Sequence, residues 1–228
     1  MTEIQPDLSV LTSQELASLL DSVDRVRECY RVLEKGGLNI VGEVLRGQGT
    51  FYEMEHYPKG DVFDRQSQSQ YYYHAHRPDN PEHGHFHTFL RVPDASPDDD
   101  RTMHLVAISM NAWGYPIGLF TTNRWVTDEK WHAAEQVIPR IGEFEIDHAA
   151  PSWPVNIWIT HFIRLFRYQI TALIKARDQA IRASGFPLTE ILENRDFEVL
   201  SECSVNLDAW QEALTREARQ RDIGSFNT

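Results

Sequence analysis

Half of the 10 histidines in this 228-residue chain lie between Gln70 and Arg91, in the stretch QYYYHAHRPDNPEHGHFHTFLR. Side chains along a β-strand alternate between the two faces of a sheet, so histidines at every second position project from one face. Two such pairs predict a β-hairpin with a histidine-bearing face. Neutral imidazole is the commonest protein ligand for divalent transition metals. The candidate metal ligands are His74, His76, His83, His85 and His87.

Strand register decides whether these imidazoles meet, because a slip of one residue turns the side chains of one strand to the opposite face. We expect His76 opposite His85, which also sets His74 opposite His87. Directly opposed residues in an antiparallel pair have Cβ atoms about 4.5–5.5 Å apart, close enough for their rings to share one ion. The alternative register, with His76 opposite Gly84, would separate the two pairs. A network of histidines without metal is the competing interpretation.

A carboxylate near the hairpin could complete a catalytic metal site. Two or three histidines, one carboxylate and an open position for water or substrate are typical of non-haem iron oxygenases and many zinc hydrolases. Glu82, at the predicted turn, is the first candidate for this carboxylate and for a catalytic role. Glu53 and Glu55, on a predicted strand, are alternatives, and His104 opens a later strand.

Three further side chains are candidates for contacts with a substrate. Tyr72 alternates in phase with His74 and His76, so its hydroxyl could act as a catalytic proton donor. Arg77 and Arg91 lie at the ends of the hairpin strands, and a guanidinium group can bind an anion through two parallel hydrogen bonds. Core packing for the tyrosine and surface charge for the arginines are the ordinary alternatives.

Composition indicates a folded protein of ordinary hydrophobicity. With 41% hydrophobic and 25% charged residues, the chain can bury a substantial core, and we predict a single domain over residues 1–228. The net charge of −12 opposes an extended surface for nucleic acid. Cys29 and Cys203 form no C-x-x-C pattern, and the acidic N-terminus is unlike a signal peptide. We therefore expect a cytoplasmic protein.

The most apolar stretch, residues 153–174, contains several charged and polar side chains, too many for a comfortable membrane span. We therefore predict no membrane helix. The stretch is unusually aromatic, and an exposed aromatic face could dock a partner protein. The aromatic side chains concerned are Trp153, Trp158, Phe162 and Phe166.

Hydrophobic spacing predicts an α+β fold, with an antiparallel meander of about five strands that could be barrel-like and helices at both ends. Leucine and valine recur at helical spacing over residues 13–35. A β-rich core at 50–125 holds the candidate metal site. Besides the hairpin, its predicted strands are 51–57, 103–110 and 117–124.

The C-terminal part, residues 127–222, is predicted to be mainly helical. Helices are expected at 128–138, from about 154 to 184, and after Asp208, which could cap the last one. A strand is expected at 197–205.

Two resemblances follow from these motifs. The order His74, His76 and Glu82 resembles the first motif of the cupin superfamily, in which H-x-H and a glutamate on a β-barrel bind iron, manganese, nickel or zinc. The spacing to Glu82 is longer here, and Gln68 stands where that motif has a glycine. The segments HYPKGDVFD, EHGHFHTFLR, GLFTTNRWVT and RLFRYQI resemble an uncharacterised bacterial family, a resemblance that implies no particular activity.

These patterns leave two classes of function open. In the first, the protein is a metalloenzyme that activates dioxygen or water at an open coordination position and acts on a small molecule. In the second, the metal site is not catalytic, and the protein is a binding or assembly factor that docks a partner protein. Iron is the first choice of divalent transition metal, with zinc, manganese or copper as alternatives. Histidines of two chains could also meet in a homo-oligomer.

Overall fold

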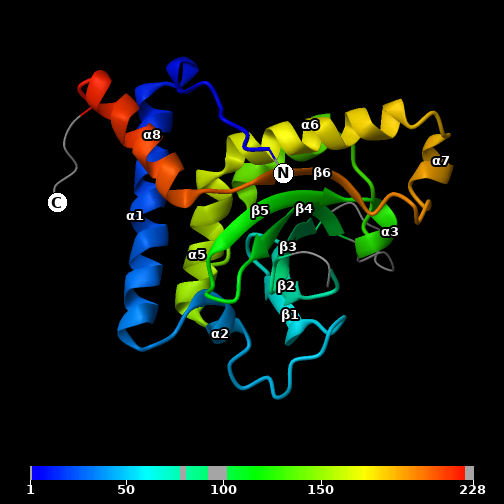
Figure 1. The fold of residues 1–228 in the computed structure, drawn as a ribbon, viewed down its shortest axis with the longest axis horizontal. Coiled ribbons are helices and arrows are strands. Elements are labelled where there is room, and N and C mark those ends of the chain that lie inside the picture. Colours follow the sequence, from blue (N-terminus) through cyan, green and yellow to red (C-terminus); the bar gives the residue numbers. More distant parts are fainter. Residues whose placement is uncertain (1, 78–80, 92–101, 224–228) are drawn as a thin grey trace.

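A six-stranded antiparallel sheet forms the centre of the protein, with helices at both ends of the chain (Figure 1). This computed structural model describes residues 2–77, 81–91 and 102–223. Residues 78–80, within the predicted turn of the hairpin, and residues 92–101 and 224–228 lie outside the described residues. The predicted α+β class is therefore confirmed.

The strands follow one another across the sheet in sequence order, and β1 and β6 do not pair, so the sheet is an open meander and not a closed barrel. The strands are β1 (Tyr57–Asp64), β2 (Ser69–His74), β3 (Gly84–Arg91), β4 (Thr102–Met110), β5 (Pro116–Thr122) and β6 (Val199–Ser204). The predicted strand near residue 200 is confirmed as β6, which pairs with β5 and extends the sheet beyond the five strands expected.

The rest of the described chain contains both long and short helices. The longer ones are α1 (Ser13–Lys35), α5 (Trp153–Leu165), α6 (Arg167–Ala183) and α8 (Leu207–Gln220). The shorter ones are η1 (Leu8–Val10), α2 (Ile40–Val44), α3 (Arg124–Thr127), α4 (Ala134–Val137), η2 (Ile138–Glu143) and α7 (Leu188–Ile191). In the part of the chain that the structure describes, no helix has the length and apolar character needed to cross a bilayer.

Helix α1 has the bounds that the hydrophobic spacing predicts. Thr12 caps it: its hydroxyl accepts a hydrogen bond from the Glu15 amide, and the Glu15 carboxylate accepts one from the Thr12 amide. This reciprocal pair satisfies two amides at the start of the helix. Leucines and valines on one face of α1 are buried in the core, so the predicted amphipathic helix is confirmed.

Two predicted elements differ from the structure, because tertiary contacts replace part of the local pattern. Residues 51–56 form a turn and not a strand, with Met54 at a positive φ of 67° and its amide bonded to the carbonyl of Ala75. The predicted helix at 128–138 is shortened to α4 (Ala134–Val137), and residues 128–133 are not helical, since Asp128 takes a left-handed φ of 48° that ends α3. The following amides bond to distant partners, such as that of Ala134 to the carboxylate of Asp178.

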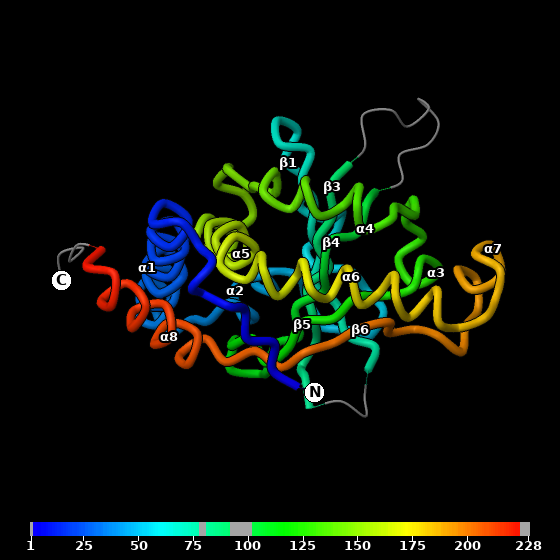
Figure 2. The backbone as a smooth tube through the Cα atoms, turned by 90° about the horizontal axis from the view of Figure 1, so that it is seen from above, coloured from blue at the N-terminus to red at the C-terminus, as the bar shows by residue number. Residues whose placement is uncertain are grey.

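The two faces of the sheet have different neighbours. The predicted long helix is divided at Phe166 into two helices, α5 and α6. Both pack on one face of the sheet (Figure 2). The ring centroids of Trp158 on α5 and Phe86 on β3 are 5.6 Å apart. The Leu173 carbonyl of α6 accepts a hydrogen bond from the Ser201 hydroxyl on β6. The opposite face carries the histidines.

Candidate metal centre

Strands β2 and β3 bring the histidine pairs together on one face of the sheet. His74 lies opposite His85, and Tyr72 lies opposite His87. The predicted pairing of His76 with His85 is therefore wrong by two residues. A shift of two residues preserves the alternation, so all four imidazoles still project from the predicted face.

Four imidazoles converge at this position: His74, His76, His85 and His87. One ring nitrogen from each lies within 4.8 Å of the others, and in five of the six pairs, all except His76 with His87, the ring centroids are 4.6 to 5.1 Å apart. The Nε2 atoms of His74 and His85 are 2.9 Å apart. Since metal–nitrogen bonds to histidine are about 2.0–2.1 Å for zinc, small side-chain rotations would let all four nitrogens reach one ion. The cluster could therefore hold a metal ion.

Two of these imidazoles are held from behind by a neighbouring side chain. Nδ1 of His85 lies 2.8 Å from Oε1 of Glu82, and Nδ1 of His87 lies 2.9 Å from Nε2 of His104. A metal-binding histidine characteristically uses its second nitrogen in this way, because the contact fixes the tautomer and the orientation of the ring. In both residues, Nε2 is the nitrogen left for an ion.

Several buried ring nitrogens in the cluster have no hydrogen-bond partner: Nδ1 of His74, Nε2 of His76 and Nε2 of His87. A buried polar atom without a partner is costly, and such atoms are rare in folded proteins. A metal ion would supply the missing partner for His76 and His87. The residues present therefore fit a metal ion.

The surroundings also keep three of the imidazoles, those of His74, His85 and His87, neutral. Burial, followed by the nearby His85 and His76, lowers the pKa of His74 to about 2. Burial and neighbouring imidazoles place the pKa of His87 well below its usual value. Burial lowers the pKa of His85 as well, which outweighs the opposite effect of Glu82. Only a neutral imidazole has a lone pair for a metal, so this environment favours metal binding.

Glu82 contacts the cluster through His85 and does not belong to the ligand group. Its side chain is 2% exposed, and its second oxygen lies 3.6 Å from the guanidinium of Arg77. Burial raises the pKa of Glu82, but the hydrogen bond with His85 and the charge of Arg77 bring it below its ordinary value. The geometry makes Glu82 an orienting carboxylate for His85.

The structure does not bring three other predicted residues to the cluster. His83 precedes β3, so strand alternation does not govern it, and its Nδ1 lies 2.8 Å from the Tyr73 hydroxyl. Its ring stacks on Phe51, away from the metal-site face. Glu53 and Glu55 are exposed in the turn that replaces the predicted strand.

Tyr72 forms one wall of the cluster. It is nearly buried, and its ring centroid lies 5.1 Å from that of His74 and 5.2 Å from that of His87. The ring of His56 stacks on the outer side of Tyr72 at 3.6 Å. Burial raises the pKa of Tyr72, so its hydroxyl keeps its proton.

A polar depression of about 610 Å³ lies beside this wall. Its lining includes His56 and also Gln70 and Arg91, which alternation places on the same face as the histidines. The Nε atom of Arg91 donates to the side-chain oxygen of Gln70, and its guanidinium lies 4.2 Å from the Phe63 ring centroid. Arg91 is therefore near the cluster but separated from it by the stacked rings.

Arg77 lies over the cluster on the side of β5 and β6. Its guanidinium is 4.5 Å from the ring centroid of Phe120 and 3.7 Å from the carboxylate of Glu202. Phe120 itself packs against His85, with ring centroids 5.0 Å apart. Arg77 is 15% exposed, so it connects the buried histidines to the surface.

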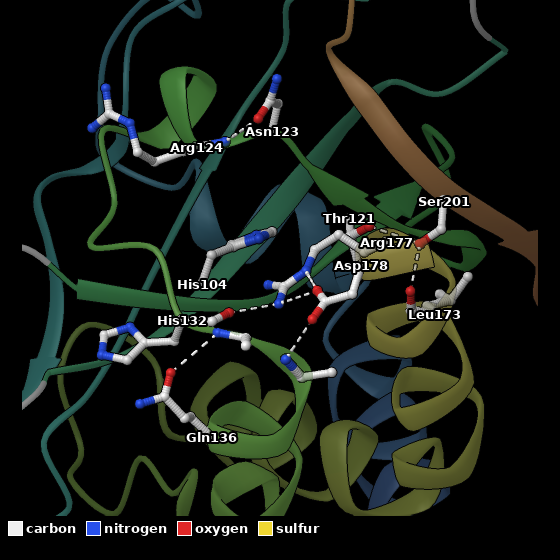
Figure 3. Close-up of polar contacts among 12 residues, drawn as sticks. His104, Thr121, Asn123, Arg124, His132, Gln136, Leu173, Arg177, Asp178 and Ser201 are labelled. Atoms are coloured by element: carbon white, nitrogen blue, oxygen red, sulfur yellow. Dashed lines mark hydrogen bonds and ion pairs between the residues drawn. The ribbon is translucent and has the colours of Figure 1, made fainter. Parts of the chain in front are cut away.

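In the sequence, His104 stands out only as the start of a later strand, and no pattern points to the residues that surround it. The backbone amide of His104 donates to the carboxylate of the buried Glu129. Burial, with a contribution from the charge of Arg177, lowers the pKa of His104 to about 3. In Figure 3, Arg177 lies between His104 and Asp178, bonded to the Asp178 carboxylate and the carbonyl of His132. No local spacing pattern marks this group, because its members come from distant segments.

Fold and site together define an α+β protein with a candidate histidine metal centre on one face of an open sheet. Residues 20–205 match DUF6969, a domain of unknown function, and the chain belongs to this family. No curated protein and no solved structure matches the chain.

Proposed function

We propose that the protein is a metal-dependent enzyme that acts on a small molecule at the histidine cluster. The observation that carries this proposal is the convergence of four imidazoles, two of them held from behind by Glu82 and His104. Buried neutral imidazoles that lack hydrogen-bond partners are costly unless they bind a ligand. The buried, unpaired cysteines agree with a cytoplasmic location, which we include in the proposal.

Iron is our first choice of metal, with zinc, manganese or copper as alternatives. Imidazole nitrogens suit iron, zinc and copper, and an open coordination position is typical of non-haem iron oxygenases, whose usual ligands are two histidines and a carboxylate. When bound, the metal would activate dioxygen or water and polarise a substrate oxygen.

The residues around the cluster have distinct proposed roles. Tyr72, protonated and in contact with His74 and His87, would donate a hydrogen bond or a proton to the bound substrate. Glu82 would contribute to catalysis by orienting His85 and strengthening it as a donor.

Arg77 and Arg91 would bind an anionic group of the substrate from opposite sides of the cluster. Arg77 reaches the edge of the cluster nearest β6, and Arg91 lines the depression beside Tyr72. A guanidinium group binds carboxylates and phosphates through paired hydrogen bonds, which favours an anionic substrate.

A closed, non-catalytic metal site is the second candidate, because three of the histidines are almost completely buried. Four protein ligands with no open position are typical of structural zinc sites. The partner-docking helix has less support, since Trp158, Phe162 and Phe166 are buried within the protein and only Trp153 is substantially exposed.

Elemental analysis of protein purified without chelator tests the metal site. We expect near-stoichiometric metal in the wild type and its loss in His74→Ala and His85→Ala, with far-UV circular dichroism largely unchanged. His83→Ala is the matched control, because it removes an imidazole from the same hairpin outside the cluster. Full metal content in both cluster variants would refute the proposed site.

If the metal is redox-active, oxygen consumption with a panel of small carboxylic acids tests the enzymatic part of the proposal. We expect turnover that depends on Tyr72 and Arg91. Tyr72→Phe should reduce this turnover and leave the metal content unchanged. Stoichiometric metal with no turnover across the panel would favour the closed-site alternative.

A further inference from the structure

The four histidines are not equivalent in their attachment to the fold. His74 is the last residue of β2, and His85 and His87 lie within β3, so hydrogen-bonded strands fix their backbones. His76 lies two residues beyond the end of β2, outside the sheet. Its backbone is therefore the least restrained of the four.

Solvent exposure of the side chains also sets His76 apart from the other three histidines. His85 and His87 are 0% exposed and His74 is 6% exposed, whereas the side chain of His76 is 13% exposed. His76 is thus the only member of the cluster, within the described residues, that solvent reaches to an appreciable extent.

Contacts behind the rings distinguish His76 from His85 and His87, although not from His74, whose Nδ1 has no partner. His85 and His87 have partners at 2.8 and 2.9 Å, both of which are buried side chains of the sheet or its adjoining turn. Nδ1 of His76 lies 3.5 Å from the carboxylate of Glu198, whose side chain is 41% exposed. A long contact to an exposed carboxylate restrains a ring less than a short contact in the interior.

We infer that His74, His85 and His87 hold the metal permanently and that His76 is a displaceable fourth ligand. This inference rests on the proposed function and adds how a buried cluster could offer an open position. When His76 moves away, a substrate or water can take its place beside the three remaining imidazoles. Glu198, whose side chain is 41% exposed and lies 3.5 Å from Nδ1 of His76, would accept a hydrogen bond from the displaced ring.

The proposed movement also explains where the substrate would enter. His76 and Arg77 are consecutive, and their carboxylate neighbours Glu198 and Glu202 both lie beside or on β6. A ligand that displaces His76 would therefore meet the guanidinium of Arg77 at the same edge. Small anionic ligands are the class that this edge would favour.

Cobalt(II) and azide test the inference without a known substrate. Cobalt binding is measured by equilibrium dialysis, and azide binding by the visible absorption of the cobalt-loaded protein. We expect His76→Ala to retain one cobalt with an affinity loss of about tenfold or less, and His87→Ala to lose at least about a hundredfold. Because no side chain competes, azide should bind cobalt-loaded His76→Ala at least about tenfold more tightly than wild type.

The controls separate this inference from the proposed metal site. His83→Ala should match wild type in both measurements, and far-UV circular dichroism identifies any variant that fails to fold. His87→Gln replaces His87→Ala if the latter unfolds. Equal cobalt loss in His76→Ala and His87→Ala, or equal azide affinity in wild type and His76→Ala, would overturn the inference alone. Failure of wild type to bind cobalt would overturn the metal site itself.

Discussion

At the scale of single residues, His104 shows how a side chain outside the ligand group can determine metal affinity. Its Nε2 lies 2.9 Å from Nδ1 of His87. If His87 binds metal through Nε2, its Nδ1 carries the proton, and His104 must accept that hydrogen bond. His104 is therefore a positioning residue for the site.

Replacing His104 should weaken metal binding without removing a ligand. We expect His104→Leu to lower cobalt affinity by about 10–100-fold, the usual effect of losing such a contact. His104→Gln retains an acceptor near the same position and should recover part of the affinity. Competition with a chelating dye measures both variants. Equal affinities in His104→Leu and wild type would show that His87 needs no support.

Glu129 is a buried residue whose charge should make stability depend on pH. Burial raises its pKa from 4.5 to about 7, against the opposing effects of Arg177 and Arg124. The folded protein therefore holds this proton more tightly than the unfolded chain does. Its ionisation should destabilise the fold as pH rises from about 4.5 to about 7, by an amount on the order of 3 kcal/mol.

Glu129→Gln removes this titration while keeping an acceptor for the His104 amide. Relative to wild type, the variant should become more stable to unfolding as pH rises through that range. Above the range, the difference in unfolding free energy should stay constant. Urea unfolding at a series of pH values measures it. A difference that stays constant with pH would contradict the assigned pKa. The buried histidines act in the opposite direction, since their lowered pKa values reduce stability as pH falls below about 6.5.

At the scale of elements, the β2–β3 hairpin depends on close backbone approach at Gly84. A Cβ atom added there would lie 2.6 Å from the carbonyl oxygen of His74 and 2.7 Å from the Tyr73 hydroxyl. Since His74 pairs with His85 next to this glycine, any separation of the strands would also move two ligands.

Gly84→Ala should therefore damage both stability and the metal site. We expect a loss of about 1–3 kcal/mol in unfolding free energy, the usual cost of overpacking, together with weaker metal binding. Gly142→Ala is the matched control, because a Cβ there meets no atom within 4 Å. Denaturant unfolding and cobalt titration measure both variants. Equal metal affinity in Gly84→Ala and Gly142→Ala would mean that the hairpin tolerates the separation.

At the scale of the whole molecule, one hydrophobic cluster joins helices from both ends of the chain to the sheet. It includes Leu16 of α1, Phe86 of β3, Trp158 of α5 and Leu214 of α8. The single domain expected from the sequence stays a prediction, and this shared cluster supports it.

Thermal unfolding tests the single domain and the metal together. We expect one transition with equal calorimetric and van't Hoff enthalpies. An ion that binds only the folded state should stabilise it by about 2.7 kcal/mol at a free concentration 100 times its dissociation constant. The ion should therefore raise the unfolding temperature, and chelator should reverse this shift. His85→Ala should show no shift in unfolding temperature when the ion is added. Two separate transitions would refute the single domain, and a shift that persists in His85→Ala would place the ion elsewhere.

Local periodicity accounts for the elements that were predicted correctly. Helix α1 and strands β4, β5 and β6 follow from hydrophobic spacing over consecutive residues. The same spacing failed at residues 51–56 and 128–133, where long-range hydrogen bonds from Met54 to Ala75 and from Lys130 to Thr102 replace the local structure. Sequence spacing contains no information about such distant partners.

For the site, the sequence alone determined which face of the hairpin carries the histidines. Alternation along a strand is local, so His74, His85 and His87 share a face in any register that differs by an even number of residues. The tertiary structure decided the actual pairing, the exclusion of His83 and the support from His104. These depend on contacts between segments far apart in the chain, which only the packed sheet brings together.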